Sequence, residues 1–284
     1  MSRHTSFKVG GPADVLADPS EPQHVRALRS FAVQREVPFT LIGAGTNILV
    51  RDGGIRGIVC RLGPAMARIA IDEEHRRIEV QAGALLRQVS LRAAEASLSG
   101  MEWAVGIPGN MGGAIFMNAG AHGGAMADVV VGVLALTSDC RFRRWTPEEL
   151  EFGYRESALQ GTGDIVLEAT LALEPGDREA IERRHEEILE KRRAAQPLDM
   201  PSAGSVFKRP PGDFAGRLIE AAGLKGTARI GGAMVSGKHA GFIVNTGDAT
   251  AADILRLIDL VQRTVRVKMD VELEPEVRVL GEDG

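Results

Sequence analysis

The segment Gly106-Ile-Pro-Gly-Asn-Met-Gly-Gly-Ala-Ile-Phe-Met-Asn-Ala-Gly-Ala-His-Gly-Gly124 contains seven glycines in nineteen residues. A run this rich in glycine cannot pack a core through its side chains, but it lets other groups approach the backbone closely. The apolar residues Ile107, Met111 and Ile115 argue against a flexible linker. Backbone N–H groups that converge in this way suit a pyrophosphate or a flat ring. The segment therefore predicts a cofactor-binding surface.

A second glycine segment lies earlier, at Leu41-Ile-Gly-Ala-Gly-Thr-Asn-Ile-Leu-Val50. It reads as a strand, a tight turn at Gly43 and Gly45, two polar residues and another strand. Thr46 and Asn47 could add side-chain donors for a phosphate, although any glycine turn between two strands would fit equally well. The segment is not a Rossmann fingerprint, because Ile48 replaces the third glycine and a strand follows where a helix is required.

A third glycine motif, Gly232-Ala-Met-Val-Ser-Gly-Lys238, has the spacing of a P-loop. The next residue is His239, which cannot hold magnesium as the usual serine or threonine does. A strand is expected at Gly241–Val244, where a P-loop would continue as a helix. We therefore do not expect phosphate-transfer chemistry.

Composition places the chain among ordinary globular proteins. Its 284 residues are 44% hydrophobic and 25% charged, with 34 glycines and a net charge of −4. This balance gives no reason to expect nucleic acid or a membrane surface as a partner. The longest apolar run, 129–136, is too short to span a bilayer, so we expect no membrane insertion. Cys60 and Cys140 are too few and too far apart in the sequence for a set of zinc ligands or a disulfide framework. We therefore expect a cytoplasmic protein with reduced thiols and without a metal site.

Hydrophobic periodicity predicts a mixed α and β chain. We expect helices over 22–35, 85–96, 177–195, 214–223 and 248–267, and strands over 39–42, 48–50, 58–60, 69–71, 78–80, 129–136, 165–173, 241–244 and 277–280. A domain boundary is expected near residue 175. The helix over 177–195 is rich in charge; we interpret it as a solvated connection between two domains, with anion binding by its basic clusters as the alternative.

Seven motifs taken together resemble one family. They are 4–11 (HTSFKVGG), 43–50 (GAGTNILV), 106–113 (GIPGNMGG), 153–157 (GYRES), 202–208 (SAGSVFK) and 238–245 (KHAGFIVN), and 273–281 (LEPEVRVLG) closes the set. In this order they resemble the UDP-N-acetylenolpyruvoylglucosamine reductase (MurB) family, in its shorter, type II branch. The resemblance covers nearly the whole chain. That branch lacks the inserted loop whose tyrosine caps the substrate in longer members.

The resemblance implies an α+β fold. Residues 1–175 would form a PCMH-type, vanillyl-alcohol-oxidase-like FAD-binding lobe in two parts, about 1–62 and 63–175. Residues 176–284 would form a smaller α/β substrate-binding domain, whose last strand returns Glu276 to the flavin. FAD would be held by Gly43, Ala44, Gly45, Thr46, Asn47, Ile48, Gly106, Pro108, Gly109, Met111, Gly112, Gly113, Asn118, Gly120 and Ala121.

The implied activity is that of a UDP-N-acetylmuramate dehydrogenase of peptidoglycan precursor synthesis. NADPH would be the reductant and UDP-N-acetylglucosamine enolpyruvate the oxidant. The catalytic residues would be Arg155, Ser205 and Glu276, and substrate contacts would come from Tyr154, Lys208, Lys238 and His239. Two alternatives are a sugar or alcohol oxidase of the same FAD superfamily and a nucleotide-sugar binding protein without turnover.

Three positions depart from the family pattern. His4 and Arg209 stand where many relatives have asparagine, and Gly237 stands where an acidic residue is common. None of the three is among the implied catalytic residues.

The implied catalytic residues suit the chemistry. A cationic arginine such as Arg155 can stabilise the enolate that forms when hydride adds to the enolpyruvyl double bond. A hydroxyl such as that of Ser205 can protonate so basic a group.

Overall fold

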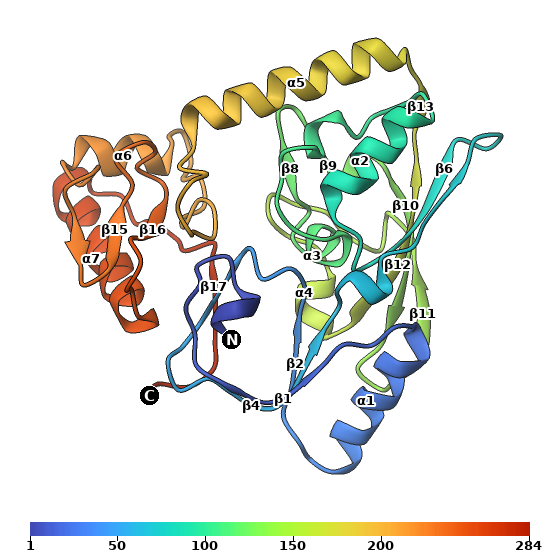
Figure 1. Cartoon of the computed structure of the whole chain (residues 1–284), viewed down its shortest axis with the longest axis horizontal. Helices are drawn as coiled ribbons and strands as arrows, with labels where there is room; N and C mark the ends of the chain where they lie inside the picture. Colours follow the sequence, from blue (N-terminus) through green and yellow to red (C-terminus); the bar gives the residue numbers. More distant parts are fainter. The chain divides into compact units, whose positions relative to one another are not determined.

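The computed structural model describes all residues from 1 to 284 and divides into two compact units (Figure 1). The central unit comprises Leu16–Ala44 and Ile58–Arg192. The terminal unit comprises Met1–Val15, Gly45–Gly57 and Arg193–Gly284. Each unit therefore combines segments that are distant in the sequence. The boundary expected near residue 175 falls within the short strand β13 (Glu174–Pro175) and stays a prediction.

The central unit is built on an antiparallel sheet with the strand order β11-β10-β12-β6-β5. Its strands are β5 (Ile69–Asp72), β6 (Arg77–Gln81), β10 (Val130–Leu136), β11 (Phe142–Trp145) and β12 (Ile165–Ala172). In β6 the apolar side chains alternate with exposed ones, so that Ile78 and Val80 enter the core. The helix α3 (Met111–Phe116) packs against β6 and β12. The hairpin of β5 and β6 is confirmed.

The central unit contains further helices and short strands. They are α1 (Pro22–Gln34), β2 (Phe39–Ile42), α2 (Leu86–Glu95), β7 (Leu98–Ser99), β8 (Gly120–Ala121), β9 (Gly124–Ala125), α4 (Leu159–Thr162) and α5 (Arg178–Ala195). The strand β4 (Ile55–Arg61) pairs in parallel with β2 and lies between β2 and β1 (Ala13–Ala17). Short 3-10 turns occupy Ser2–His4, Pro64–Met66, Glu102–Ala104 and Met126–Asp128.

The terminal unit contains a second sheet of three short antiparallel strands. These are β14 (Arg229–Ile230), β15 (Ala233–Val235) and β16 (Ile243–Asn245), flanked by α6 (Ala215–Ala221) and α7 (Ala251–Met269) (Figure 1). The apolar stripe expected on the last helix is confirmed, because Ile254, Leu257, Ile258, Val261 and Val265 are all buried. In the same unit β3 (Ile48–Val50) pairs in parallel with β17 (Arg278–Leu280).

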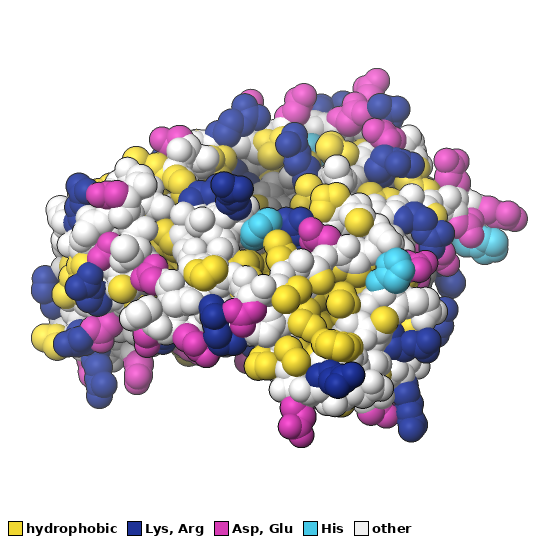
Figure 2. Space-filling view, turned by 60° about the horizontal axis from the view of Figure 1, so that its bottom comes forward, with side chains coloured by type: hydrophobic (Ala, Val, Ile, Leu, Met, Phe, Trp, Pro, Cys, Tyr) yellow, Lys and Arg dark blue, Asp and Glu magenta, His cyan; other side chains and the backbone are white.

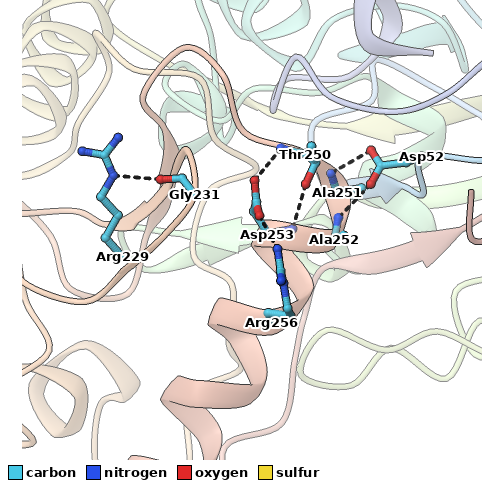
Figure 3. Close-up of polar contacts among 8 residues, drawn as sticks. All are labelled: Asp52, Arg229, Gly231, Thr250, Ala251, Ala252, Asp253 and Arg256. Atoms are coloured by element: carbon cyan, nitrogen blue, oxygen red, sulfur yellow. Dashed lines mark hydrogen bonds and ion pairs between the residues drawn. The ribbon is translucent and has the colours of Figure 1, made fainter.

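Helix α7 begins at an unusually complete cap. Thr250 accepts a hydrogen bond from the backbone N–H of Asp253, and the Asp253 carboxylate accepts one from the N–H of Thr250. The two carboxylate oxygens of Asp52 accept the next two N–H groups, those of Ala251 and Ala252, each at 2.9 Å (Figure 3). A carboxylate there also complements the positive end of the helix dipole. The β3–β4 turn is thereby bound to the first turn of α7.

The surface carries both signs of charge. Figure 2 shows lysine and arginine side chains interspersed with aspartate and glutamate over the face drawn. This mixture agrees with the small net charge of −4. No helix of the chain is both long and apolar enough to cross a membrane.

Helix α5 is attached to the central unit through a buried histidine. His185 is 5% exposed, and its Nε2 lies 2.9 Å from Oγ of Ser90, which itself donates to the carbonyl oxygen of Met101. Since the Ser90 proton is committed to Met101, the imidazole must donate through Nε2. Burial lowers the pKa of His185, and Glu102 and Glu182 oppose this shift. The folded protein therefore favours the neutral imidazole.

We expect acid to destabilise the protein partly through His185. Because the folded pKa lies below the unfolded value of 6.5, the unfolded state binds the proton more readily, and stability falls as the pH drops below about 6.5. The urea midpoint at pH 8 and at pH 5.5 measures this loss. His185→Gln should show a smaller loss than the wild type. Equal losses in the two proteins would contradict the assignment.

Candidate active site

The glycine turn at Gly43 is held against the long glycine segment by Asn110. A Cβ on Gly43 would lie 2.3 Å from Oδ1 of Asn110, so only glycine fits there. Asn110 is 4% exposed, and its Nδ2 donates to the carbonyl oxygen of Leu62 at 2.6 Å. One buried amide thus fixes the distance between the end of β2, the end of β4 and the start of α3 in the central unit.

The middle of the long glycine segment is paired rather than open. The N–H groups of Met111 and Gly112 donate to the carbonyl oxygens of Ala84 and Ala82, at 2.8 and 2.9 Å. A Cβ on Gly112 would lie 3.0 Å from the Cβ of Ala82. These two amides therefore hold α3 in place within the protein. The helix itself was not expected, since two adjacent glycines at 112–113 disfavour helix formation.

Arg155 lies in a strained turn of the same unit, which the glycine segment supports. Its φ of 60° is in the left-handed region. The guanidinium donates to the carbonyl oxygen of Gly120 at 3.2 Å, and its central carbon lies 5.4 Å from the centroid of the Tyr154 ring. Asn118 donates through Nδ2 to the carbonyl oxygen of Gly153 at 2.8 Å. The structure thus brings Asn118, Gly120, Tyr154 and Arg155 together.

The end of helix α5 adds a cation that we did not anticipate. The side chain of Arg192 lies over Gly106, where a Cβ would come within 2.5 Å of its Cδ. Burial lowers the pKa of Arg192, although a guanidinium still keeps its charge at neutral pH. The pKa of His122 is lowered by burial and by the nearby charges of Arg184, Arg192 and Lys191. The glycine segment is therefore bordered by positive charge.

The sequence does carry a signal for Arg192. Ile181, His185 and Ile188 are the buried residues of α5, and Arg192 follows them at the spacing of the same helix face. The helix was interpreted as a solvated connection because most of its residues are charged. A cation placed in line with a buried stripe indicates a partly desolvated charge, and this distinguishes Arg192 from its exposed neighbours Lys191 and Arg193.

In the terminal unit, backbone pairing brings Ser205 and Glu276 close together. Phe207 forms an antiparallel bridge with Pro275, and Ser205 forms one with Phe242. The N–H of Glu276 donates to the carbonyl oxygen of Val206 at 2.7 Å, and the N–H of Val206 donates to that of Gly241 at 2.9 Å. The segment around Ser205 thus runs between the segments 241–242 and 274–276. Ser205 is exposed and Glu276 is half-buried.

His239 lies beside this pair. A Cβ on Gly241 would meet Cε1 of His239 at 3.0 Å and Oγ of Ser205 at 3.7 Å. The N–H of Gly241 donates to Nδ1 of His239 at 3.1 Å, which places the proton of the neutral ring on Nε2. Burial is the main cause that lowers the pKa of His239. The imidazole is therefore a neutral hydrogen-bond donor through Nε2 at neutral pH.

The two candidate lysines differ in their surroundings. Nζ of Lys208 lies 2.7 Å from Oε1 of Glu274, next to the bridge between Phe207 and Pro275. Nζ of Lys238 instead donates to the carbonyl oxygen of Arg193 at 2.5 Å. Lys208 therefore belongs to the cluster of Ser205 and Glu276, whereas Lys238 is engaged at the end of α5.

The fold of residues 13–145 defines a class of flavoprotein, because this stretch matches the model of an FAD binding domain. Residues 196–280 match the model of the C-terminal domain of UDP-N-acetylenolpyruvoylglucosamine reductase.

Full-length relatives narrow the class to one family. A UDP-N-acetylenolpyruvoylglucosamine reductase from Lactobacillus gasseri is 50% identical over 283 residues, which cover 100% of this chain and 93% of the relative. One from Clostridium perfringens is 47% identical, with coverages of 100% and 92%. The crystal structure of the Thermus caldophilus enzyme (MurB) superimposes with a TM-score of 0.83 at 39% identity, covering 99% of this chain and 97% of that one. The chain therefore belongs to the UDP-N-acetylenolpyruvoylglucosamine reductase family.

We expect Gly43→Ala to disrupt the site through Asn110. The added methyl group must displace the Asn110 amide from the Leu62 carbonyl, which loses a buried hydrogen bond worth about 1–3 kcal/mol. Urea denaturation should show this loss, and the FAD content of the purified protein should fall with it. Gly161→Ala is the matched control, because a Cβ at that helical position meets nothing within 4 Å. Equal stability and equal FAD content in the two variants would refute the role of Asn110.

Proposed function

We propose that this chain catalyses the NADPH-dependent reduction of UDP-N-acetylglucosamine enolpyruvate to UDP-N-acetylmuramate, a step of peptidoglycan precursor synthesis. The observation that carries the proposal is a sequence identity of 47–50%, along the whole chain, to UDP-N-acetylenolpyruvoylglucosamine reductases. The main-chain contacts between the segments 205–207 and 274–276 support it, because they bring the backbone of Ser205 near that of Glu276 in the terminal unit.

The residues present suit FAD. The glycine segment 106–124 leaves little side-chain bulk, and Arg192 with the cations near His122 offers charge for a diphosphate. We propose that the main chain of 43–48 and the segment 106–121 hold the cofactor with Arg192. Glycines such as Gly43 and Gly112 let neighbouring segments of the backbone pack closely in these two segments. Asn118 and Gly120 support the turn and the guanidinium of Arg155 through hydrogen bonds. When bound, FAD supplies the hydride that NADPH has delivered to it.

The chain's own residues then complete the reaction on the substrate. Hydride adds to the β-carbon of the enolpyruvyl double bond, so negative charge develops on the α-carbon and its carboxylate. We propose that Arg155 stabilises this charge, because an arginine keeps its cation and can pair with a carboxylate. Ser205 would then donate its hydroxyl proton to the α-carbon, and Glu276 would stabilise the intermediate. His239 and Lys208, beside Ser205, are suited to the diphosphate of the substrate.

Two further assignments belong to this proposal. We propose that residues 1–175 and 176–284 act as the FAD-binding and substrate-binding domains, with small molecules as their partners. We also propose a cytoplasmic location, where both cysteines would stay reduced. Both are free thiols. Burial raises the pKa of Cys60 to about 12, which makes this thiol unreactive.

The purified protein should absorb in the visible flavin bands, and NADPH should bleach it. The enolpyruvyl substrate should then restore the colour without oxygen. Rapid reoxidation by oxygen with no response to the substrate would favour a flavin oxidase instead. Tight substrate binding without any reoxidation would favour a binding protein.

Ser205→Ala should separate the two half-reactions. Bleaching by NADPH needs no proton from Ser205 and should keep its rate, whereas reoxidation by the enolpyruvyl substrate should slow by about 100-fold or more, as expected when a general acid is lost. Stopped-flow absorbance measures both rates. An equal loss in both half-reactions would exclude Ser205 as the proton donor.

A further inference from the structure

The side chain of Asn47 extends the parallel pairing of β3 with β17. The ladder begins with Ile48 opposite Arg278, so Glu276 lies two residues before its first pair. The N–H of Arg278 donates to the carbonyl oxygen of Asn47 at 3.1 Å. Nδ2 of Asn47 donates to the carbonyl oxygen of Glu276 at 3.3 Å, between residues 229 positions apart. The amide of Asn47 thus reaches the backbone of Glu276, which strand pairing alone does not.

The other side of Glu276 is fixed as well. Its N–H donates to the carbonyl oxygen of Val206, the residue after Ser205, at 2.7 Å. The backbone of Glu276 is therefore held at its N–H by the Ser205 segment and at its carbonyl by Asn47. These two hydrogen bonds restrict the backbone on both sides of the Glu276 Cα. They therefore restrict the direction in which its side chain extends from the backbone.

We propose that Asn47 is a positioning residue for Glu276, and that its side chain acts through this carboxyl group rather than as a ligand of the cofactor. The inference rests on the proposed reductase function and on the role of Glu276 in it. Its basis is that the donor of Asn47 is directed at the chain's own carbonyl oxygen. A small displacement of a catalytic group is enough to slow a reaction considerably.

The proposal separates the two half-reactions. Flavin reduction by NADPH uses neither Ser205 nor Glu276, whereas reoxidation by the enolpyruvyl substrate uses both. Loss of the Asn47 amide should therefore leave cofactor binding and flavin reduction in place and should impair reoxidation. A side chain that held the cofactor would affect all three.

The test uses Asn47→Ala and Asn47→Asp in the full-length flavoprotein. Alanine removes the donor, and aspartate keeps the shape but places an acceptor against the Glu276 carbonyl. Both variants should keep their FAD content and their rate of reduction by NADPH within about twofold, and both should be reoxidised by the enolpyruvyl substrate at least tenfold more slowly. A comparable loss in FAD content or in the reductive rate overturns the proposal.

A double-mutant cycle distinguishes positioning from general damage. Asn47→Ala should slow reoxidation by less than twofold when Glu276 is already alanine, because there is no carboxyl group left to position. A full tenfold loss in that background overturns the proposal.

Asn245→Ala is the matched control, since Asn245 donates in the same way to the carbonyl oxygen of Phe7 within the terminal unit. It should lower stability and affect both half-reactions alike; a selective loss of reoxidation in this variant also overturns the proposal. Wild-type protein that the substrate fails to reoxidise overturns the proposed function, and this inference with it.

Discussion

The terminal unit depends on the parallel pairing between β3 and β17, which joins the early glycine segment to the last strand of the chain. This pairing sets the register of residues 48–50, and the hydrogen bond between Asn47 and Glu276 extends the contact beyond the first pair. Backbone bonds then connect Glu276 to Val206, and Val206 to Gly241. Three loops that carry polar groups are thus aligned by main-chain geometry, which is far stiffer than any contact between exposed side chains.

In the central unit, side-chain amides rather than strand pairing hold the loops in place. Asn110 joins three chain segments through contacts with Gly43 and Leu62, and Asn118 supports the turn that carries Arg155. Glycine is required at position 43 because the Asn110 side chain occupies the space that a Cβ would need. The glycine richness of the chain therefore reflects close packing within the protein as well as room for a cofactor.

Much of this fold could be predicted from local patterns. The stripe of α7 and the hairpin of β5 and β6 follow from periodicity, which depends only on near neighbours in the chain. The helix α3 could not be predicted, because its two glycines disfavour it and only pairing with Ala82 and Ala84 stabilises it. The partnership of Asn47 with Glu276 was also beyond the sequence, since nothing local indicates which carbonyl a distant amide will meet. The family resemblance named the proposed catalytic residues but not what holds them.

The cap that Asp52 provides for α7 has a consequence for synthesis on the ribosome. The β3–β4 turn is made early, but the helix that it caps and the strand that pairs with β3 emerge about 200 to 230 residues later. At roughly 5–20 residues per second, this interval lasts about 10–50 s. During that time β3 is a short apolar strand with an open edge, the kind of segment that pairs with other chains. The edge of β3 therefore stays open to pairing with other chains until β17 has been translated.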